Sequence, residues 1–207
     1  MIHFIPLFPL NVVLFPGMSL PLHIFEERYK ELIGECLRTK SSFGVLYSHG
    51  KTTERIGCTA KVLKIIKKYD DGKIDLFTLG DQRFKIVHFD TEASYLRGWS
   101  NPYSDNDSVS PPDKDEVNHL LELYREISYL LNKKKSEVIL GSSNSESLSF
   151  HIASDPYLPK KIKQQVLESR SEKHRVEILT SYFIKRLPFL HQMEVGAKKA
   201  GSNGNIR

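Results

Sequence analysis

Residues 5–29, IPLFPLNVVLFPGMSLPLHIFEERY, decide how the chain begins to fold. No Asp, Glu, Lys or Arg occurs in residues 1–25, whereas four prolines do: Pro6, Pro9, Pro16 and Pro21. A proline inside a helix costs about 3 kcal/mol, because it lacks an N–H and clashes with the preceding turn. We therefore expect no membrane-spanning helix here, and we expect no signal peptide because the first basic residue is Arg28, after the apolar run. We predict extended, buried pieces over 2–7 and 12–15, ended by a Pro-Gly turn.

The segment from Ile24 to Lys40 has the spacing of an amphipathic helix. Glu26 and Glu27 lie in its expected first turn, where a negative charge complements the helix dipole. Apolar residues recur at steps of three and four: Phe25, Tyr29, Leu32, Ile33, Cys36 and Leu37. We predict one helix here, with these side chains on its buried face.

Short runs rich in β-branched and aromatic residues follow this helix. They predict strands over 43–47, 56–68, 73–79, 82–89 and 95–99. Turn-forming sequences separate them: Ser48-His49-Gly50, Asp70-Asp71-Gly72 and Gly80-Asp81. We therefore expect residues 1–110 to be a β-rich subdomain with one early helix.

The composition changes between residues 101 and 115, where Ser, Asp, Asn and Pro predominate and predict a linker. Asp113 and Glu116 then have the spacing of a capping box at the start of a long helix. We expect residues 111–195 to form a helical bundle subdomain, and residues 196–207 to be a disordered tail.

Three shorter signals locate the remaining helices. The run 148–154 suggests a short helix, and Pro159 is well placed to open the next one. Ser171 is expected to cap the last helix, and Pro188 is expected to end it.

Composition limits the function classes. The chain has 207 residues, 40% of them hydrophobic and 27% charged, which is typical of a soluble globular protein. Its net charge is +5, and neither half is strongly basic: residues 1–110 hold 14 basic and 13 acidic residues, and residues 111–207 hold 16 and 12, so charge alone does not indicate a nucleic-acid partner. Cys36 and Cys58 are too few for a disulfide framework or a four-cysteine zinc site, and free thiols suit a reducing compartment. We expect a cytoplasmic protein.

A search for catalytic and cofactor motifs finds none. Gly50-Lys51-Thr52 lacks the glycine that a phosphate loop requires five positions before its Gly-Lys pair, since Val45 stands there. No two of the eight histidines are four residues apart, so a metal site is unsupported. There is no Gly-x-Ser-x-Gly nucleophile motif. We assign no catalytic, cofactor-binding or metal-binding residue.

Several motifs together identify a family. The segments 5–17, 20–26 and 28–29 resemble the opening of the Lon protease N-terminal substrate-binding domain family. The resemblance continues, in order, through 43–45, 56–60, Gly80-Asp81-Gln82-Arg83-Phe84 and 95–96. It includes the short helices over 148–175 and covers roughly residues 2–190.

The resemblance implies an α+β fold, a PUA-like pseudobarrel followed by a helical bundle. It also implies a non-catalytic, proteolysis-related module that binds polypeptide segments or a partner protein. The ATPase and Ser–Lys protease modules of full-length Lon proteases are expected to be absent. RNA binding is the alternative, because PUA-like barrels also serve that purpose. An enzyme that uses His88, Asp90 or His151 is a third hypothesis, which only the residue types support.

Four residues are candidates for partner binding. Arg28 and Arg83 are arginines of the family pattern, and each is explained either by a salt bridge or by binding of a carboxylate or peptide backbone. Trp99 and Tyr103 are an aromatic pair next to the linker, and either interface packing or ligand contact explains them.

Overall fold

The computed structural model describes residues 2–106, 108–132 and 148–202. The chain separates into two compact units. One comprises Met1–Asp105 and Ala153–Arg170, and the other comprises Asn106–Ile152 and Ser171–Arg207. This division differs from the single boundary expected between residues 110 and 111, because 153–170 belong with the β-rich unit.

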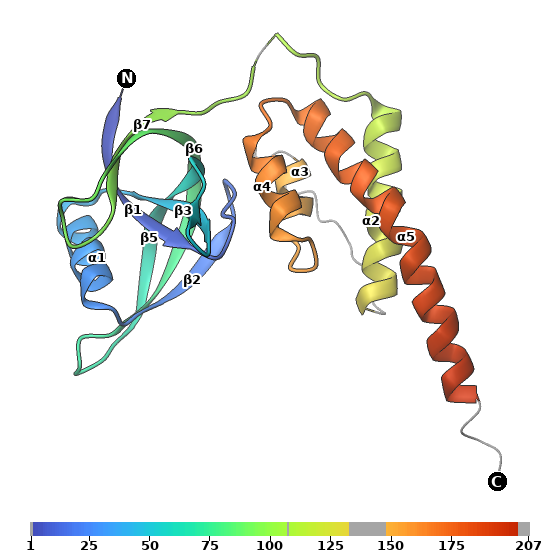
Figure 1. Ribbon diagram of the computed structural model, residues 1–207, viewed down its shortest axis with the longest axis horizontal. Coiled ribbons are helices and arrows are strands. Elements are labelled where there is room, and N and C mark those ends of the chain that lie inside the picture. The colour runs from blue at the N-terminus through green and yellow to red at the C-terminus, as the bar shows by residue number, and fades with distance from the viewer. Residues whose placement is uncertain (1, 107, 133–147, 203–207) are drawn as a thin grey trace. The chain divides into compact units, whose positions relative to one another are not determined.

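The strands of the β-rich unit form a barrel, and the helix over Glu27–Thr39 packs against it (Figure 1). Strand β1 pairs with both β7 and β3, which closes the hydrogen-bonded order β1-β7-β6-β5-β3 into a ring. Strand β2 pairs with β6 outside this ring, and β4 pairs with β3. The predicted α+β barrel is therefore confirmed. The elements are β1 (His3–Leu10), β2 (Ser19–Ile24), α1 (Glu27–Thr39), β3 (Phe43–His49), β4 (Thr52–Thr53), β5 (Ile56–Lys68), β6 (Ile74–Asp90) and β7 (Arg97–Pro102).

The proline-rich first strand fits the barrel because it changes partner halfway. His3–Pro6 pair antiparallel with β7, and Leu7–Leu10 pair parallel with β3. Each half is thus paired along one edge, so the missing N–H groups of Pro6 and Pro9 are compatible with the strand. The first predicted extended piece is confirmed. The second, 12–15, is buried as expected but forms no strand.

Strand β6 runs through Gly80-Asp81, where the sequence predicts a turn, so that prediction is wrong. Gly80 is needed for a different reason. The turn at Pro16-Gly17 crosses β6 at this point, and the Gly80 N–H donates to the Met18 carbonyl at 2.9 Å. A Cβ on Gly80 would lie 2.0 Å from the Phe15 carbonyl oxygen. The glycine therefore permits two backbone segments to touch.

The helices after the barrel lie close to their predicted positions. They are α2 (Lys114–Asn132), α3 (Leu148–Ala153), α4 (Lys160–Glu168) and α5 (Glu172–Ser202). The capping box at the start of α2 is confirmed: the Glu116 N–H donates to Asp113 and the Asp113 N–H donates to Glu116, both at 2.8 Å. In the second unit α2 packs along α5, with Tyr124 stacked on Phe183 at 6.0 Å.

Helix α5 does not end at Pro188, so that prediction is wrong. Contacts beyond the proline stabilise the continuing helix, since Leu190 is buried and His191 contacts Glu126 at 2.8 Å. The helix also covers 196–202 of the expected tail, while 203–207 lie outside the described residues. None of the helices in the described ranges combines the length and apolar content that crossing a membrane requires.

A substitution at Gly57 on β5 tests how closely the strands of the barrel pack. An added Cβ would lie 2.2 Å from the Val45 carbonyl oxygen, so Gly57→Ala is expected to lower the free energy of unfolding by about 2–4 kcal/mol. Gly34 on α1 is the matched control, because no atom lies within 4 Å of its added Cβ. Gly34→Ala should raise stability by about 0.5–1 kcal/mol. Urea unfolding measures both, and equal effects would contradict the packing described here.

Candidate functional site

The β-rich unit has a half-open pocket of about 250 Å³ where β1 and β2 end and α1 begins. Its floor is buried and apolar: Phe8 is 5%, Ile24 1% and Tyr29 9% exposed. Phe8 and Tyr29 stack with their ring centres 4.0 Å apart. The lining residues are Phe8, Pro9, Leu10, Leu22, His23, Ile24, Phe25, Glu26, Arg28 and Tyr29. All of them come from the charge-poor start of the chain and the motif that follows it.

Phe25 lies at the rim of this pocket and is 57% exposed. The sequence pattern places it on the buried face of a helix, and the structure shows that this is wrong. Strand β2 ends at Ile24 and α1 begins only at Glu27, so Phe25 lies in the connection between them. Because Phe25 precedes the helix, the helical spacing that buries Tyr29 and Leu32 does not determine where its side chain points.

Arg28 is at the same rim and forms an ion pair within its own segment. Its Nη2 lies 2.7 Å from a carboxylate oxygen of Glu26, and its guanidinium lies 4.5 Å from the centre of the Tyr29 ring. Burial raises the pKa of Tyr29, and the positive charge of Arg28 opposes this shift. The phenol is therefore neutral at physiological pH, and the only charges of this group are those of Arg28 and Glu26.

His23 connects the pocket to the strands beside it. Its ring stacks on Phe25 with ring centres 5.9 Å apart, and its Nδ1 lies 2.5 Å from a carboxylate oxygen of Asp75. The Tyr69 hydroxyl donates to the other oxygen of Asp75 at 2.7 Å. The hydrogen bonds from His23 and Tyr69 lower the pKa of Asp75, which is therefore ionised at neutral pH.

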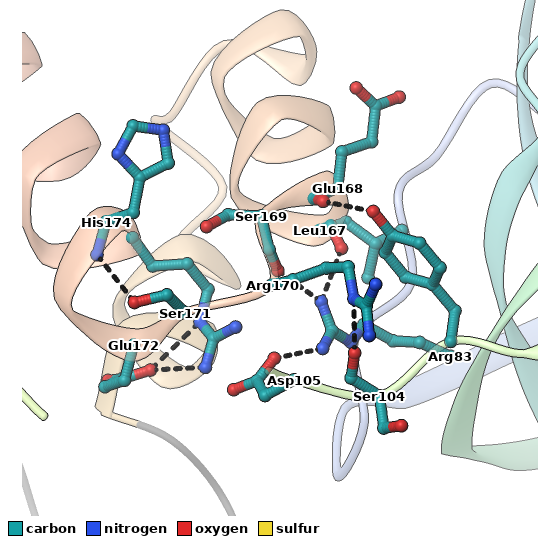
Figure 2. A network of polar contacts seen from close by, with 12 residues as sticks. Arg83, Ser104, Asp105, Leu167, Glu168, Ser169, Arg170, Ser171, Glu172 and His174 are labelled. Carbon is teal, nitrogen blue, oxygen red and sulfur yellow. Dashed lines mark hydrogen bonds and ion pairs between the residues drawn. The ribbon is translucent and has the colours of Figure 1, made fainter. Parts of the chain in front are cut away.

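Arg83 is only 8% exposed and binds the end of α4 (Figure 2). Its Nη1 donates to the carbonyl oxygens of Leu167 at 2.9 Å and Ser169 at 2.5 Å, and its Nη2 pairs with Asp105. The last carbonyls of a helix have no partner within the helix and carry partial negative charge. Arg83 caps them, which joins α4 to the barrel.

Tyr103 acts at the same place. Its hydroxyl donates to the Glu168 carbonyl at 2.8 Å, and the guanidiniums of Arg83 and Arg170 each lie 5.4 Å from its ring centre. Arg170 also donates to the Ser104 carbonyl, a contact drawn in Figure 2, and the two atoms lie 2.9 Å apart. Arg83 and Tyr103 thus bind peptide backbone, but it is backbone of this chain.

Trp99 and Tyr103 have different contact partners. Trp99 packs against Phe4 at 4.8 Å and His88 at 5.6 Å between ring centres, and it is 40% exposed. The structure therefore brings together only two of the four sequence candidates, Arg83 and Tyr103, while Arg28 belongs to the pocket. Sequence reasoning did not select Phe25 or His23 as site residues, although both lie in the motif that carries the family resemblance.

The residues considered for catalysis are engaged in other contacts or separated. Burial raises the pKa of the Cys58 thiol to about 12 and also raises that of Cys36, so neither thiol is an activated nucleophile. Asp90 pairs with Arg97 at 2.7 Å, and His151 belongs to the second unit, unlike His88. Over the described residues, no group of three or more His, Cys, Asp or Glu is arranged to hold a metal ion.

Arg83 should matter more to stability than to binding. Arg83→Ala leaves the Leu167 and Ser169 carbonyls without this donor, so we expect a loss of about 3 kcal/mol and faster amide exchange in α4. Arg28→Ala is the control, because its ion pair with Glu26 is half exposed and should contribute less than about 1 kcal/mol. Urea unfolding and hydrogen exchange by mass spectrometry measure these effects. Equal losses for the two variants would contradict the capping role.

The chain is similar in sequence to several Lon proteases. The Lon protease of Anaeromyxobacter dehalogenans is 27% identical over 188 residues, which are 84% of this chain and 22% of that protein. The Lon protease of Methylocella silvestris is 25% identical over 202 residues, 92% of this chain and 25% of that protein. The chain thus spans about a quarter of the length of the curated relatives it matches.

Two solved structures share the fold. A Lon N-terminal domain protein from Xanthomonas campestris superposes with a TM-score of 0.67 at 23% identity. The N-terminal domain of a Mycobacterium avium complex Lon protease superposes with a TM-score of 0.63 at 16% identity. Each alignment covers 87% of this chain and 98% of the solved chain. The family model of the ATP-dependent protease La (LON) substrate-binding domain matches residues 5–185, and the chain belongs to this family.

Proposed function

We propose that this chain is a non-catalytic module that binds extended polypeptide segments, and that an apolar side chain of the segment enters the pocket beside Phe25. The observation that carries the proposal is the combination of a buried apolar floor with a large apolar side chain left exposed at the rim. Membership of a substrate-binding family supports it. The buried thiols with raised pKa values support a non-catalytic role, and free buried cysteines support a cytoplasmic location.

The size of the pocket favours a side chain over a cofactor. Small-molecule sites usually have roughly 300–1,000 Å³, and this pocket has about 250 Å³. Fully burying a large apolar side chain contributes roughly 1.5–3 kcal/mol. Phe25 is 57% exposed, so an inserted side chain would fill the pocket and also cover Phe25. The affinity gained from one such side chain is low. A segment with several apolar side chains would bind more tightly.

The polar groups at the rim suit peptide backbone. Two N–H groups of the Arg28 guanidinium bind Glu26, at 2.9 and 2.7 Å, and a guanidinium has five such donors. The remaining donors are available to a peptide carbonyl. Strand addition is a poorer mode of binding, because Pro21 in β2 has no N–H to offer along the strand. We therefore favour insertion of a side chain.

Phe25→Ser tests the pocket. The probe is a 14-residue peptide that alternates Leu or Phe with Gln, carries no charge and bears a neutral fluorophore. Because Phe25 covers the inserted side chain, the variant should bind this peptide about five- to tenfold more weakly, as measured by fluorescence anisotropy. Tyr157→Ser is the matched control, since Tyr157 is an aromatic residue of the same unit and is 54% exposed. It should bind as the parent chain does.

A second peptide, with the Leu and Phe positions replaced by Ser, controls for apolar recognition and should not bind. If Phe25→Ser and Tyr157→Ser weaken binding equally, the pocket is not the site. If neither peptide binds the parent chain, or if the chain hydrolyses the peptides, the proposed function is overturned.

A further inference from the structure

Strand β5 is irregular where it pairs with the first half of β6, in the hairpin that Figure 1 shows between them. The register shifts between Val62 and Lys64 and again between Ile65 and Lys67. Each shift inserts one extra residue opposite a single residue of the partner strand. The inserted residues are Leu63 and Ile66, which are 60% and 52% exposed. Two aliphatic side chains thus project into solvent from one strand.

Basic and apolar residues of β5, β6 and β2 lie next to Leu63 and Ile66. Lys64 is the register partner of Phe77, which is 43% exposed and is also the partner of Pro21 on β2. Lys67 is the partner of Asp75, which is in turn the partner of His23. Register partners share one face of a sheet. Lys64, Lys67 and Phe77 therefore lie on one face, and we call these three, together with the exposed bulge residues Leu63 and Ile66 that precede the two lysines in β5, the outer hairpin face.

Among the described residues, the two lysines of this face form no ion pair, although the charge of Lys67 contributes, after the hydrogen bonds from His23 and Tyr69, to the lowered pKa of the ionised Asp75. The Lys67 ammonium lies 4.4 Å from the centre of the Tyr69 ring. The carboxylate next to them, Asp75, is bound by His23 and Tyr69. Lys61, farther along β5, is paired with Asp81 at 2.8 Å. Two ammonium groups thus lie among exposed apolar side chains with no carboxylate of the described ranges within ion-pair distance.

We propose that the outer hairpin face binds the acidic part of the same polypeptide segment whose apolar side chain enters the pocket, so that the chain prefers segments in which apolar and acidic residues alternate. The proposal rests on the proposed polypeptide binding and adds a charge specificity to it. The two surfaces are continuous, because the His23 ring contacts Phe25 at the pocket and Tyr69 at the hairpin, with ring centres 5.9 and 6.0 Å apart.

The chemistry of the face favours a polypeptide over a nucleic acid. Single-stranded nucleic acids bind proteins by stacking bases on aromatic side chains along a basic groove. Of the three exposed apolar side chains of this face, Leu63 and Ile66 are aliphatic and Phe77 is aromatic, and the neighbouring Tyr69 ring already contacts the Lys67 ammonium at 4.4 Å. Aliphatic groups next to lysines complement Leu, Ile or Phe next to Asp or Glu.

Three peptides with the same Leu and Phe residues test the charge specificity. Their alternate positions are Glu, Gln or Lys, and their affinities are measured by fluorescence anisotropy at low and high salt. Two exposed ion pairs should make the Glu peptide bind about tenfold more tightly than the Gln peptide, and salt should weaken this advantage. The Lys peptide should bind more weakly than the Gln peptide.

The double variant Lys64→Gln, Lys67→Gln should lose the advantage of the Glu peptide and keep the affinity for the Gln peptide. Its matched control is Lys85→Gln, Lys185→Gln, which removes two exposed lysines elsewhere and has the same net charge. The control should keep the full preference for the Glu peptide.

The outcomes separate this inference from the proposed function. If all three peptides bind equally and Phe25→Ser weakens all of them, the charge specificity is wrong and the pocket stands. If none of the peptides binds, both fail. If a single-stranded RNA 12-mer binds more tightly than the Glu peptide and loses affinity in the Lys64, Lys67 variant, the face is a nucleic-acid site and the inference is overturned.

Discussion

The double pairing of β1 is the constraint on which the barrel and its pocket depend. Its first half pairs with β7 and its second half with β3, which joins the two ends of the strand order. The same pairing places Phe8, Pro9 and Leu10 where β2 ends and α1 begins. Prolines suit this strand, because each half needs hydrogen bonds along one edge and a fixed φ lowers the entropy lost on folding.

Arg83 and Tyr103 show how a charged and an aromatic residue serve architecture in a binding domain. Carbonyls at the end of α4 that lack helical partners accept hydrogen bonds from these two side chains, and Gln164 of the same helix donates to the Ile56 carbonyl of β5 at 3.1 Å. A helix distant in sequence is thereby part of the barrel unit. This is the physical reason that residues 153–170 separate from the other helices.

In the proposed mode of binding, the pocket and the outer hairpin face would make two different physical contributions to recognition. The pocket offers apolar burial, which is non-directional and tolerates many side chains. The lysines of the hairpin offer charge, which adds little affinity at an exposed site but would, as proposed, discriminate between acidic and basic segments.

The sequence by itself determined the elements whose signals are local. The prolines excluded an N-terminal helix, the β-branched run 56–68 coincides with β5, and Asp113 and Glu116 form the capping box that their spacing predicts. Tertiary structure alone decided the features that depend on distant contacts. Gly80 permits a backbone crossing rather than a turn, Pro188 lies inside a helix stabilised beyond it, and Phe25 is exposed because β2 determines where α1 begins. Local patterns predict which conformation a segment prefers, but packing between segments far apart in sequence determines which of its side chains remain available to bind.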